Sequence, residues 1–392
     1  MILQLYNTNV GGDYMSFETY YEDKPLEVDV HKLKLENERK INVVSLFSGC
    51  GGMDLGFRGD FEFLGQKYEK NPFNIIFSND IFSAAMKVYE HNFKHKGVEE
   101  DISEMDLSCV PKADIVIGGF PCQDFSLAGK RKGLMTERGR LYEHMIRVIK
   151  HCDAKMFVAE NVDGIRTNKT NKNINLSALD KILRDFENNG YVVQYKVLNA
   201  ADYGVPQIRK RVIIFGVKKE IYNSIYYPLA THDEHGEFGR KAWKTSKDAI
   251  DDLWDKIDSP AIFNHTSKDY SKAKFYPGKK MQGNNRIYMD RPSCTIRAEH
   301  HGNIEAHYRT LIPHDEANME GWRRLSVREC ARLQSFPDDF NFIVSASSAY
   351  KMIGNAVPPV MGWHVARAAF YTLSMSKQDY QVELELEAAI NK

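Results

Sequence analysis

The chain has 392 residues, 43% of them hydrophobic, which is enough for two domains or for one large α/β domain with an insertion. Lys plus Arg and Asp plus Glu both total 53, so any nucleic-acid site has to come from local patches and not from bulk charge. No apolar run approaches the ~20 residues of a membrane span, and the acidic N-terminus lacks a signal-peptide layout. We therefore expect a cytoplasmic protein without a membrane partner.

The cysteines and the first forty residues limit the possible classes of protein further. The six cysteines include no C-x-x-C pair, which argues against a zinc site and predicts free thiols in a reducing compartment. Residues 1–40 are charged and rich in tyrosine without a clear periodicity. We interpret them as an N-terminal extension that packs outside the core or is partly mobile.

A glycine turn follows the first strong apolar run. Residues 41–47 are β-branched and apolar and predict a strand, the segment 48–52 holds three glycines, and Met53 begins a predicted helix. Glycines at this place let a ligand lie against backbone N–H groups at a helix N-terminus, as in nucleotide-binding α/β folds. Glycine-rich turns between a strand and a helix also occur for packing reasons, so the motif alone is weak evidence for a ligand site.

Two acidic residues follow the next strands. The strand at 75–79 ends on Asp80, and a carboxylate at that place in a βαβ unit commonly accepts hydrogen bonds from ribose hydroxyls. Asp101 precedes the next repeat and could accept from an adenine amino group, although a solvated surface acid explains it equally well.

A cysteine is displayed after the strand at 115–117. Its loop, 118–126, begins with two glycines, and Pro121 fixes the backbone just before Cys122. This layout is typical of a nucleophilic cysteine held in a tight loop at the end of a strand, and a buried structural cysteine is the alternative.

Strand and helix then alternate. We predict strands at 156–159, 191–197 and 211–217 and helices at 141–150 and 176–189. The alternation predicts a doubly wound sheet with ligands at the carboxyl ends of its strands. Gly49, Asp80, Cys122 and Glu160 should then face one crevice, with Glu160 following its strand directly, although Glu160 could instead cap the next loop.

Basic residues alternate where the chain enters the last of these strands. Gln207, Arg209 and Arg211 fall on one face, since side chains alternate along an extended segment. Arginines that face inward need anionic or carbonyl partners, whereas a charged strand edge is the other interpretation.

Six ordered blocks stand out in the chain, at 47–52, 119–126, 160–162, 207–211, 324–337 and 354–359. They cover 41–217 and 322–370, and together with their order and spacing they resemble the cytosine-5 DNA methyltransferases of bacterial type II modification systems. The departures are Cys50, where the family often has a small or apolar residue, and Ile81, where it often has an aromatic ring on the adenine.

The resemblance implies a fold and a division of the chain. The fold is α/β, of the Rossmann-like class I S-adenosylmethionine-dependent methyltransferase type, with an inserted smaller target-recognition domain. The extension would be 1–40, the catalytic and cofactor-binding domain 41–218 with 322–392, and the target-recognition domain 219–321, where the α/β rhythm stops. Ser326 and Glu329 form a capping box, so a helix should begin there, and Asn355 should lie in a turn before a final helix at 360–373 that packs beside the first strand.

The resemblance also assigns catalytic roles. Cys122 would add to carbon 6 of cytosine, because carbon 5 is a poor nucleophile until the ring is converted to an enamine. Glu160 would stabilise the ring at nitrogen 3, and Arg211 would hold the cytosine carbonyl and orient Glu160, while Arg209 or Arg211 favours the thiolate. The target base has to flip out of the duplex.

The implied cofactor is S-adenosylmethionine, with S-adenosylhomocysteine as product and no metal. It would be held by the glycine turn, by the acids at the next strand ends and by the segment before the final helix. The full set is Phe47, Ser48, Gly49, Cys50, Gly51, Gly52, Asp80, Ile81, Asp101, Ile102, Pro121, Leu141, Asn355 and Ala356.

The implied partner is double-stranded DNA with a short target site. A basic segment follows the cysteine loop, and between 268 and 309 nine Lys or Arg stand against four Asp or Glu, although solvated basic loops look alike. Thr295 resembles the family's phosphate-bracing threonine, and Arg297 and its neighbours are suited to base edges. The predicted DNA contacts are Gln123, Ser126, Lys130, Gln207, Thr295, Arg297, His300, His301 and Asn303.

We therefore expect a monomeric enzyme that works beside a cognate restriction endonuclease and protects host DNA. One rival is a cytosine-5 methyltransferase of transfer RNA, but the recognition segment is long for that branch. The other is an inactive DNA-binding regulator of the same fold, which would not need Cys122, Glu160 and Arg211 together.

Overall fold

The structure is a computed structural model that describes residues 25–34, 40–121, 140–167, 169–171, 174–269, 285–298, 307–311, 321–376 and 383–384. Its centre is a seven-stranded sheet of order β12-β13-β9-β8-β3-β6-β7. The strands are β3 (Ile41–Leu46), β6 (Phe73–Asp80), β7 (Val98–Glu99), β8 (Ile115–Gly118), β9 (Met156–Val162), β12 (Tyr191–Asn199) and β13 (Lys210–Lys218).

One strand of this sheet runs against the others. β13 is antiparallel to both β9 and β12, whereas β9, β8, β3, β6 and β7 are parallel to one another. The first residues of β13 therefore lie at the same edge of the sheet as the carboxyl ends of β8 and β9.

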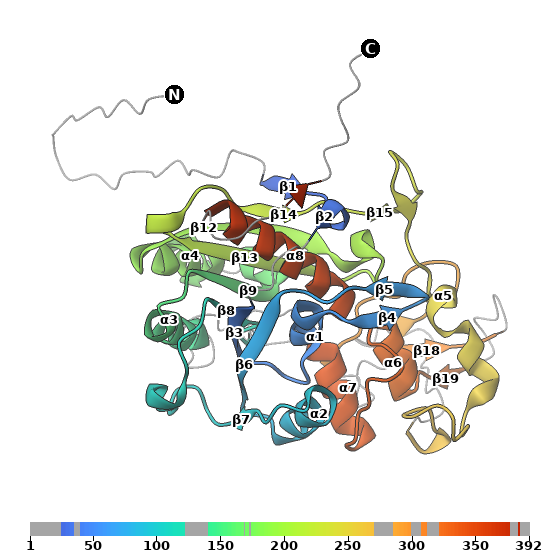
Figure 1. The fold of residues 1–392 in the computed structure, drawn as a ribbon. Helices are drawn as coiled ribbons and strands as arrows, with labels where there is room; N and C mark the ends of the chain where they lie inside the picture. Colours follow the sequence, from blue (N-terminus) through green and yellow to red (C-terminus); the bar gives the residue numbers. More distant parts are fainter. Residues whose placement is uncertain are drawn as a thin grey trace, which may run out of the picture.

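Helices cover both faces of the sheet, in three layers (Figure 1). Helices α1 (Gly52–Arg58), α2 (Ser83–Phe93) and α8 (Pro359–Ser376) share one hydrophobic cluster, which includes Val43 of β3. Helices α3 (Leu141–Cys152) and α4 (Ala178–Asn188) share the other, which includes the next residue, Val44. Successive side chains thus pack on opposite faces, which is why the strands are apolar throughout. The predicted α/β fold is confirmed.

Three details of the structure differ from the prediction. β9 continues to Val162, so Glu160 lies inside the strand and not after it. Asn355 is the last residue of α7 (Ala346–Asn355) and not part of a turn, because the helix continues until the backbone becomes extended at Ala356. The final helix begins at Pro359 and packs mainly on α1 and on the short strand β14 (Tyr226–Pro228), not on the first strand.

The described part of the N-terminal extension packs against the core. β1 (Leu26–Val28) pairs with β14, and β2 (Leu33–Lys34) pairs with β20 (Glu383–Leu384). The side chains of Val28, Val30 and Leu33 are buried in the cluster that contains α8. Residues 26–34 are thus joined to the catalytic part of the chain.

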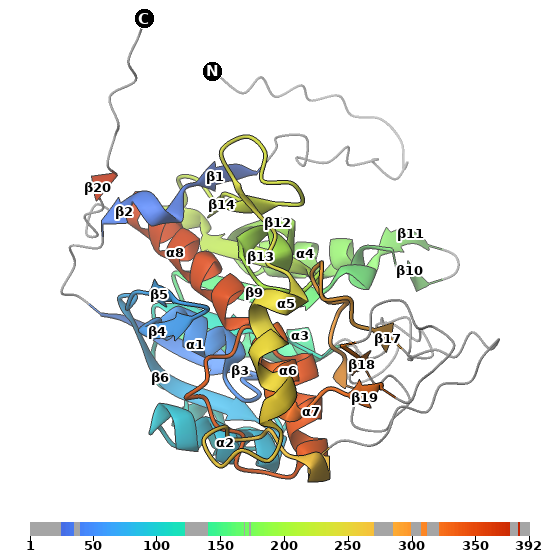
Figure 2. The same ribbon diagram turned by 90° about the vertical axis from the view of Figure 1, so that its right-hand side faces the viewer.

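The insertion lies beside helices α6 (Val327–Leu333) and α7, as Figure 2 shows for its strands β17 (Asn285–Arg286) and β18 (His307–Arg309). The Ser326 hydroxyl accepts from the Glu329 N–H and the Glu329 carboxylate accepts from the Ser326 N–H, so the predicted capping box is confirmed. The insertion also contains β15 (His232–Asp233), β16 (Lys241–Ala242) and α5 (Ser246–Ile250), and β18 pairs with β19 (Arg323–Arg324), which follows the insertion. Two hairpins complete the described strands, β4 (Phe61–Phe63) with β5 (Gln66–Tyr68) and β10 (Lys169–Asn171) with β11 (Ile174–Ser177).

Among the described helices, none combines the length and the apolar character that crossing a membrane requires.

Candidate active site

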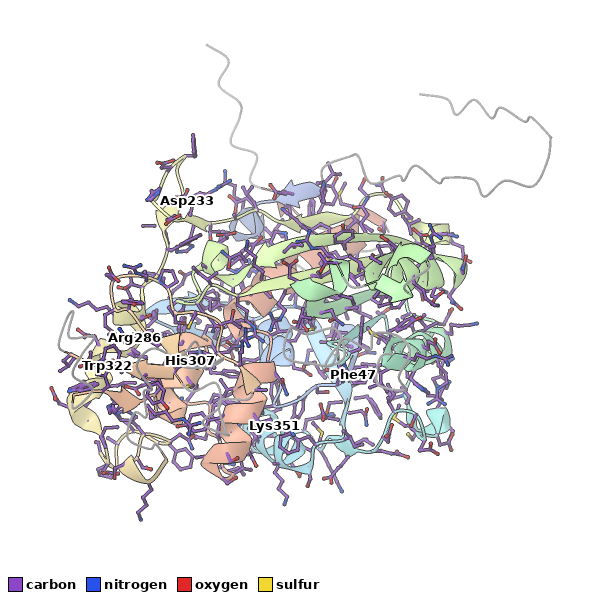
Figure 3. The ribbon with its side chains drawn as sticks, turned by 180° about the vertical axis from the view of Figure 1, so that it is seen from behind. Phe47, Asp233, Arg286, His307, Trp322 and Lys351 are labelled. Carbon is purple, nitrogen blue, oxygen red and sulfur yellow. The ribbon has the colours of Figure 1, made fainter. Side chains whose placement is uncertain are left out.

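A cavity of about 1550 Å³ opens at the carboxyl ends of the parallel strands. Gly49, Asp80 and Glu160 all line it, so these three of the four residues expected at one crevice do meet there. Phe47 and Lys351, which Figure 3 labels, line the same cavity from the β3 turn and from α7. Cys122 lies outside the described residues, but Gly118–Pro121, the residues that lead to it, are part of the wall.

The turn after β3 has an unusual backbone. Phe47 has φ of 52° although it is not a glycine, and Gly49 and Gly51 have φ of 56° and 90°. Left-handed residues of this kind concentrate at functional sites, because only surrounding contacts hold them. Phe47 lines the cavity, whereas Gly51 does not: it caps α1, and a Cβ there would lie 2.3 Å from the Phe93 ring.

Asp80 fixes this turn to the end of β6. Its carboxylate accepts from the Gly49 N–H at 2.9 Å and from the Phe82 N–H at 2.8 Å. Burial raises the pKa of Asp80, and these N–H groups oppose the shift. Each carboxylate oxygen retains a second lone pair, so the group can still accept from a ligand hydroxyl.

Asp101 stands at another part of the wall. Its Oδ1 accepts from the N–H and the hydroxyl of Ser103 at 2.9 and 2.7 Å, and these bonds lower the pKa of the carboxyl. The acid is therefore held in a fixed orientation as an anionic acceptor.

Glu160 and Arg211 form an ion pair across β9 and β13. The Arg211 Nε lies 2.7 Å from the Glu160 Oε1, and the side chains are 12% and 10% exposed. Removing a charged pair this far from water costs free energy unless the pair is well oriented, and buried charges of this kind cluster at functional sites.

The segment before Cys122 packs on Glu160. A Cβ at Gly119 would lie 2.7 Å from the Glu160 Oε2, so only glycine lets the backbone approach the carboxylate this closely. The Asn161 side-chain amide donates to the Phe120 carbonyl at 3.2 Å, which ties β9 to the same segment. The wall therefore brings the start of the cysteine loop against the acid, while Gln123, Ser126 and Lys130 lie outside the described residues.

Gln207 and Arg209 face inward, as their alternation predicts, but both are buried. Gln207 donates to the Leu333 carbonyl and to Gln334, and it accepts from the Ile296 N–H. Its 0% exposure leaves no surface for DNA, so the structure does not place it at the predicted DNA contact. The Arg209 guanidinium is also 0% exposed and donates to three main-chain carbonyls. Burial, with the charge of Arg211, lowers the pKa of Arg209.

The Thr295 loop reaches the cavity from the insertion. Thr295 and Arg297 line its wall, and the Thr295 hydroxyl donates to the Ile208 carbonyl at 2.8 Å. The His307 ring, buried in β18, bonds the Thr295 carbonyl through Nε2 at 3.1 Å, and Figure 3 shows it among the side chains of the insertion. Three predicted base readers, His300, His301 and Asn303, lie outside the described residues.

The cavity fits an adenosyl group with an amino-acid tail. The wall contains carboxylates suited to hydroxyl and amino donors and apolar side chains suited to a flat ring, and the exposed residue Asn355 also lines it. The predicted cofactor residues that line it are Phe47, Ser48, Gly49, Cys50, Gly52, Asp80, Ile81, Asp101, Ile102, Pro121, Leu141, Asn355 and Ala356.

Some lining residues escaped the sequence analysis. Lys351 precedes Asn355 by four residues on α7, and His144 follows Leu141 by three on α3, so helical spacing was the available signal. The Lys351 ammonium lies 4.6 Å from the centre of the Phe82 ring. Within the described residues, no group of three or more His, Cys, Asp or Glu is placed to hold a metal ion.

Comparison with solved structures supports the fold. The chain is similar to the Dnmt2 methyltransferase of S. pombe, with a TM-score of 0.61 and 18% identity over 85% of this chain and 99% of that one. The methyltransferase EhMeth of Entamoeba histolytica gives a TM-score of 0.61 and 17% identity over 86% and 99%.

Comparison of sequences identifies the family. The chain is 36% identical over 381 residues to the type II methyltransferase M.BsuRI of Bacillus subtilis, covering 88% of this chain and 82% of the relative. It is 35% identical to the type II methyltransferase M.NgoFVII of Neisseria gonorrhoeae, covering 82% and 84%. The family model for C-5 cytosine-specific DNA methylases matches residues 41–370. The chain therefore belongs to the C-5 cytosine-specific DNA methylase family, and it is a DNA (cytosine-5)-methyltransferase that uses S-adenosylmethionine.

Proposed function

We propose that this methyltransferase acts through a covalent bond between the Cys122 sulfur and carbon 6 of a flipped-out cytosine. The observation that carries the proposal is the Glu160–Arg211 ion pair, which borders the same cavity as Asp80 and contacts the segment that leads to Cys122. A thiolate that adds to carbon 6 makes carbon 5 nucleophilic, and the proton on carbon 5 leaves after methylation so that the thiolate can depart.

Glu160 and Arg211 would act on the cytosine ring as a unit. Nε of Arg211 is occupied by Glu160, and its Nη1 donates to the Lys210 carbonyl, so the guanidinium is fixed in place. Its positive charge can hold the cytosine carbonyl and can stabilise negative charge that develops on the ring, while Glu160 stabilises nitrogen 3. Arg209 also lines the cavity, close enough to this pair for its charge to interact with both residues, and its Nη1 and Nη2 donate to main-chain carbonyls.

The cofactor would lie along the opposite wall. S-adenosylmethionine supplies an electrophilic methyl group when it is bound. Asp80 would accept from the ribose hydroxyls, Asp101 from the adenine amino group, and Asn355 would contact the amino-acid end. The left-handed turn at Phe47 and Gly49 gives room for the backbone to approach the ligand.

DNA would contact the cavity from the side of the insertion. We assign the target-recognition domain to 219–321 and the catalytic domain to 41–218 with 322–392, although Ile225 and Tyr227 are buried in the catalytic core and mark its first residues as shared. Thr295 would brace the target phosphate, and Arg297 would read or steer the adjacent bases.

We further propose that the enzyme protects host DNA beside a cognate restriction endonuclease, because its relatives include type II methyltransferases of bacteria. It would act as a monomer, since a short target site needs no second copy, and it would work in the cytoplasm, where bacterial DNA lies. No step of the proposed chemistry needs a metal.

The deciding experiment incubates the protein and S-adenosylmethionine with plasmid DNA and maps 5-methylcytosine at base resolution. We expect one short recurrent site, complete methylation by the wild type and none by Cys122→Ser. Transfer RNA is treated in parallel. Labelling of transfer RNA without labelling of DNA would overturn the substrate, and full activity of Cys122→Ser would overturn the mechanism.

A further inference from the structure

A hairpin continues from the rim of the cavity. Asp163, Gly164 and Thr167, which follow β9, line the cavity wall, and the chain runs on into β10 and β11. The turn between these strands lies outside the described residues. Figure 2 shows the β10–β11 hairpin and the insertion strands β17 and β18 projecting on the same side of the molecule. The hairpin therefore extends the active-site wall on the side of the catalytic domain.

The hairpin has no part in the roles assigned so far. It lies between the blocks at 160–162 and 207–211 that carry the family resemblance, and it belongs to neither of them. The predicted DNA contacts also fall elsewhere in the chain. Catalysis, the cofactor and the insertion thus leave this part of the rim without a purpose.

The hairpin segment is basic in a chain whose formal net charge is zero. From Gly164 to Leu179 the sequence has three basic residues, four asparagines and no acidic residue. Basic side chains neutralise phosphates, and asparagine amides also donate to phosphate oxygens. The composition therefore fits the backbone of a nucleic acid.

The acidic residues at the two ends of this segment are engaged locally. The Asp163 carboxylate lies 2.6 Å from the Arg166 Nε. The Asp180 carboxylate accepts from the N–H and the hydroxyl of Ser177 at 3.1 and 2.7 Å in the capping box of α4, where the helix dipole offsets its charge. Both negative charges are thus balanced at the ends of the segment, and they do little to repel a phosphate near β10.

Both ends of the hairpin are anchored to the core. Ile165 and Leu179 are buried in the hydrophobic cluster that α3 and α4 share. Between them, Lys169 pairs with Ser177 across the two strands. An element that is held in place before binding costs little free energy to order, so it is suited to contact a partner.

The length of β10 sets the stretch of DNA that it can follow. Its three residues span roughly 10 Å, because an extended strand rises about 3.3 Å per residue. Phosphates of one DNA strand succeed each other at about 3.4 Å along the helix axis, so this length matches roughly three base pairs. A hairpin that starts at the cavity rim therefore reaches the backbone beside the flipped nucleotide.

We infer that the β10–β11 hairpin is a second DNA contact, in which Lys169 binds a phosphate of the duplex beside the target site, across the cavity from the Thr295 loop. This inference rests on the proposed entry of DNA from the side of the insertion. The contact adds affinity that depends on salt and not on base sequence, because phosphates carry no sequence information.

The test measures Kd for a fluorescent duplex, with the mapped target site at its centre, over a series of NaCl concentrations. Each phosphate contact contributes about 0.9 to the slope of log affinity against log salt. Lys169→Gln keeps a polar side chain and removes the charge. The slope should therefore fall by about 0.9, and Kd at about 0.15 M salt should rise roughly fivefold, equally for target and non-target duplexes.

Lys87→Gln is the matched control, because Lys87 is exposed on α2 and does not line the cavity. This variant should keep the wild-type slope. An unchanged slope in Lys169→Gln, or an equal fall in Lys87→Gln, would overturn the inference. A changed methylation site in Lys169→Gln would also contradict it, because a phosphate contact leaves the choice of bases as it is.

Two shortened duplexes locate the contact. Each ends just beyond the target site on one side and keeps its full length on the other. One of them should bind the wild type and Lys169→Gln equally, because it lacks the phosphates that the hairpin reaches. A difference that persists with both duplexes would exclude a contact beside the target site.

Methylation separates this inference from the proposed function. At saturating duplex, Lys169→Gln should keep the wild-type kcat, because the contact lies outside the reacting base, while KM for the duplex should rise. If the wild type and Lys169→Gln bind the duplex alike, only this inference fails. If the wild type binds no duplex, the proposed function fails instead.

Discussion

The Glu160 carboxylate and the Arg211 guanidinium meet at 2.7 Å because β13 runs antiparallel to β9. Arg211 is the second residue of its strand and stands opposite Val162, near the carboxyl end of β9, while Glu160 stands opposite Ile213. A parallel β13 would carry Arg211 to the other edge of the sheet. The reversed strand is therefore what supplies the cavity with a fixed positive charge.

Glu160→Gln should abolish most of the activity without unfolding the protein. Glutamine has the same shape and can still accept from Arg211, but it cannot supply a carboxyl group at nitrogen 3, so we expect kcat to fall by roughly 10²–10⁴. Methyl transfer from labelled S-adenosylmethionine measures it, and Glu27→Gln, which removes the carboxylate paired with Lys196 away from the cavity, is the control. Wild-type kcat in Glu160→Gln would exclude the assigned role.

DNA with 5-fluorocytosine at the mapped position should form a complex with the wild type that survives denaturing electrophoresis. Fluorine cannot leave as a cation, so the final elimination is blocked and the bond to Cys122 persists. Cys122→Ala should give no such complex. Cys109→Ala should give the full amount, because Cys109 is exposed and does not line the cavity. A complex formed by Cys122→Ala would identify another nucleophile.

The strand ends around the cavity were predictable because local patterns encode them. Apolar runs marked β3, β6, β8 and β9, and glycines or acids after them marked the wall, as at Gly49 and Asp80. The capping box at Ser326 is equally local. These features need no knowledge of distant parts of the chain.

The long-range packing of residues 207–209 behind the cavity was not predictable in this way. The alternation of Gln207, Arg209 and Arg211 gave the right face, but only the tertiary structure shows that Gln207 and Arg209 are covered by the Thr295 loop and α7. Gly354 carries no positive φ and no turn signal, so its need for glycine comes wholly from a backbone nearly sixty residues away in sequence. Long-range packing of this kind leaves no local pattern.

Ile81→Trp should increase the affinity for S-adenosylmethionine. Ile81 lines the cavity and is 66% exposed, and the resemblance to the family leads us to expect an aromatic ring at this place. A ring stacked on the adenine adds about 0.5–1.5 kcal/mol, which is roughly a 2- to 12-fold lower Kd. Calorimetry measures the change, and Ile343→Trp, at another exposed isoleucine outside the cavity wall, should leave Kd as it is. Unchanged affinity in Ile81→Trp would mean that the adenine does not lie next to residue 81.

Glu329→Gln should destabilise the fold by about 3–5 kcal/mol, because it removes the negative charge of a carboxylate that pairs with two arginines in the interior. Glu329 is fully buried and lies 2.9 Å from Arg309 and 2.6 Å from Arg323, and both guanidinium groups pack on the Trp254 ring. Burial opposes ionisation of Glu329, but the two arginines outweigh it and lower its pKa, so its contribution is present at neutral pH and is lost in acid.

Urea unfolding at pH ~7.5, which is above the range in which carboxyl groups titrate, measures the loss of stability in Glu329→Gln. The matched change in an exposed ion pair is Asp290→Asn, whose side chain is 70% exposed and pairs with Arg291. It should change the free energy of unfolding by less than about 1 kcal/mol. Equal effects of the two substitutions would show that the buried cluster stabilises the protein no more than an exposed ion pair does.

Asp54 should make the protein less stable as pH rises from about 4 to about 6. Its carboxyl is 1% exposed under the glycine turn and accepts from the Tyr89 hydroxyl at 2.8 Å, and burial raises its pKa to about 6 from 3.8. In this interval the folded state keeps a proton that the unfolded state releases, so unfolding becomes easier as pH increases.

Asp54→Asn removes the titration and keeps an acceptor for Tyr89. Urea unfolding across this range measures the free energy of unfolding of the variant and of the wild type. The difference between them should grow in favour of the variant by up to about 3 kcal/mol as pH rises, and it should stay constant above pH ~7. Tyr89→Phe removes a hydrogen bond that favours the charged carboxyl and should extend the interval upward. A difference between Asp54→Asn and the wild type that does not vary with pH would mean that Asp54 titrates alike in the folded and unfolded chains.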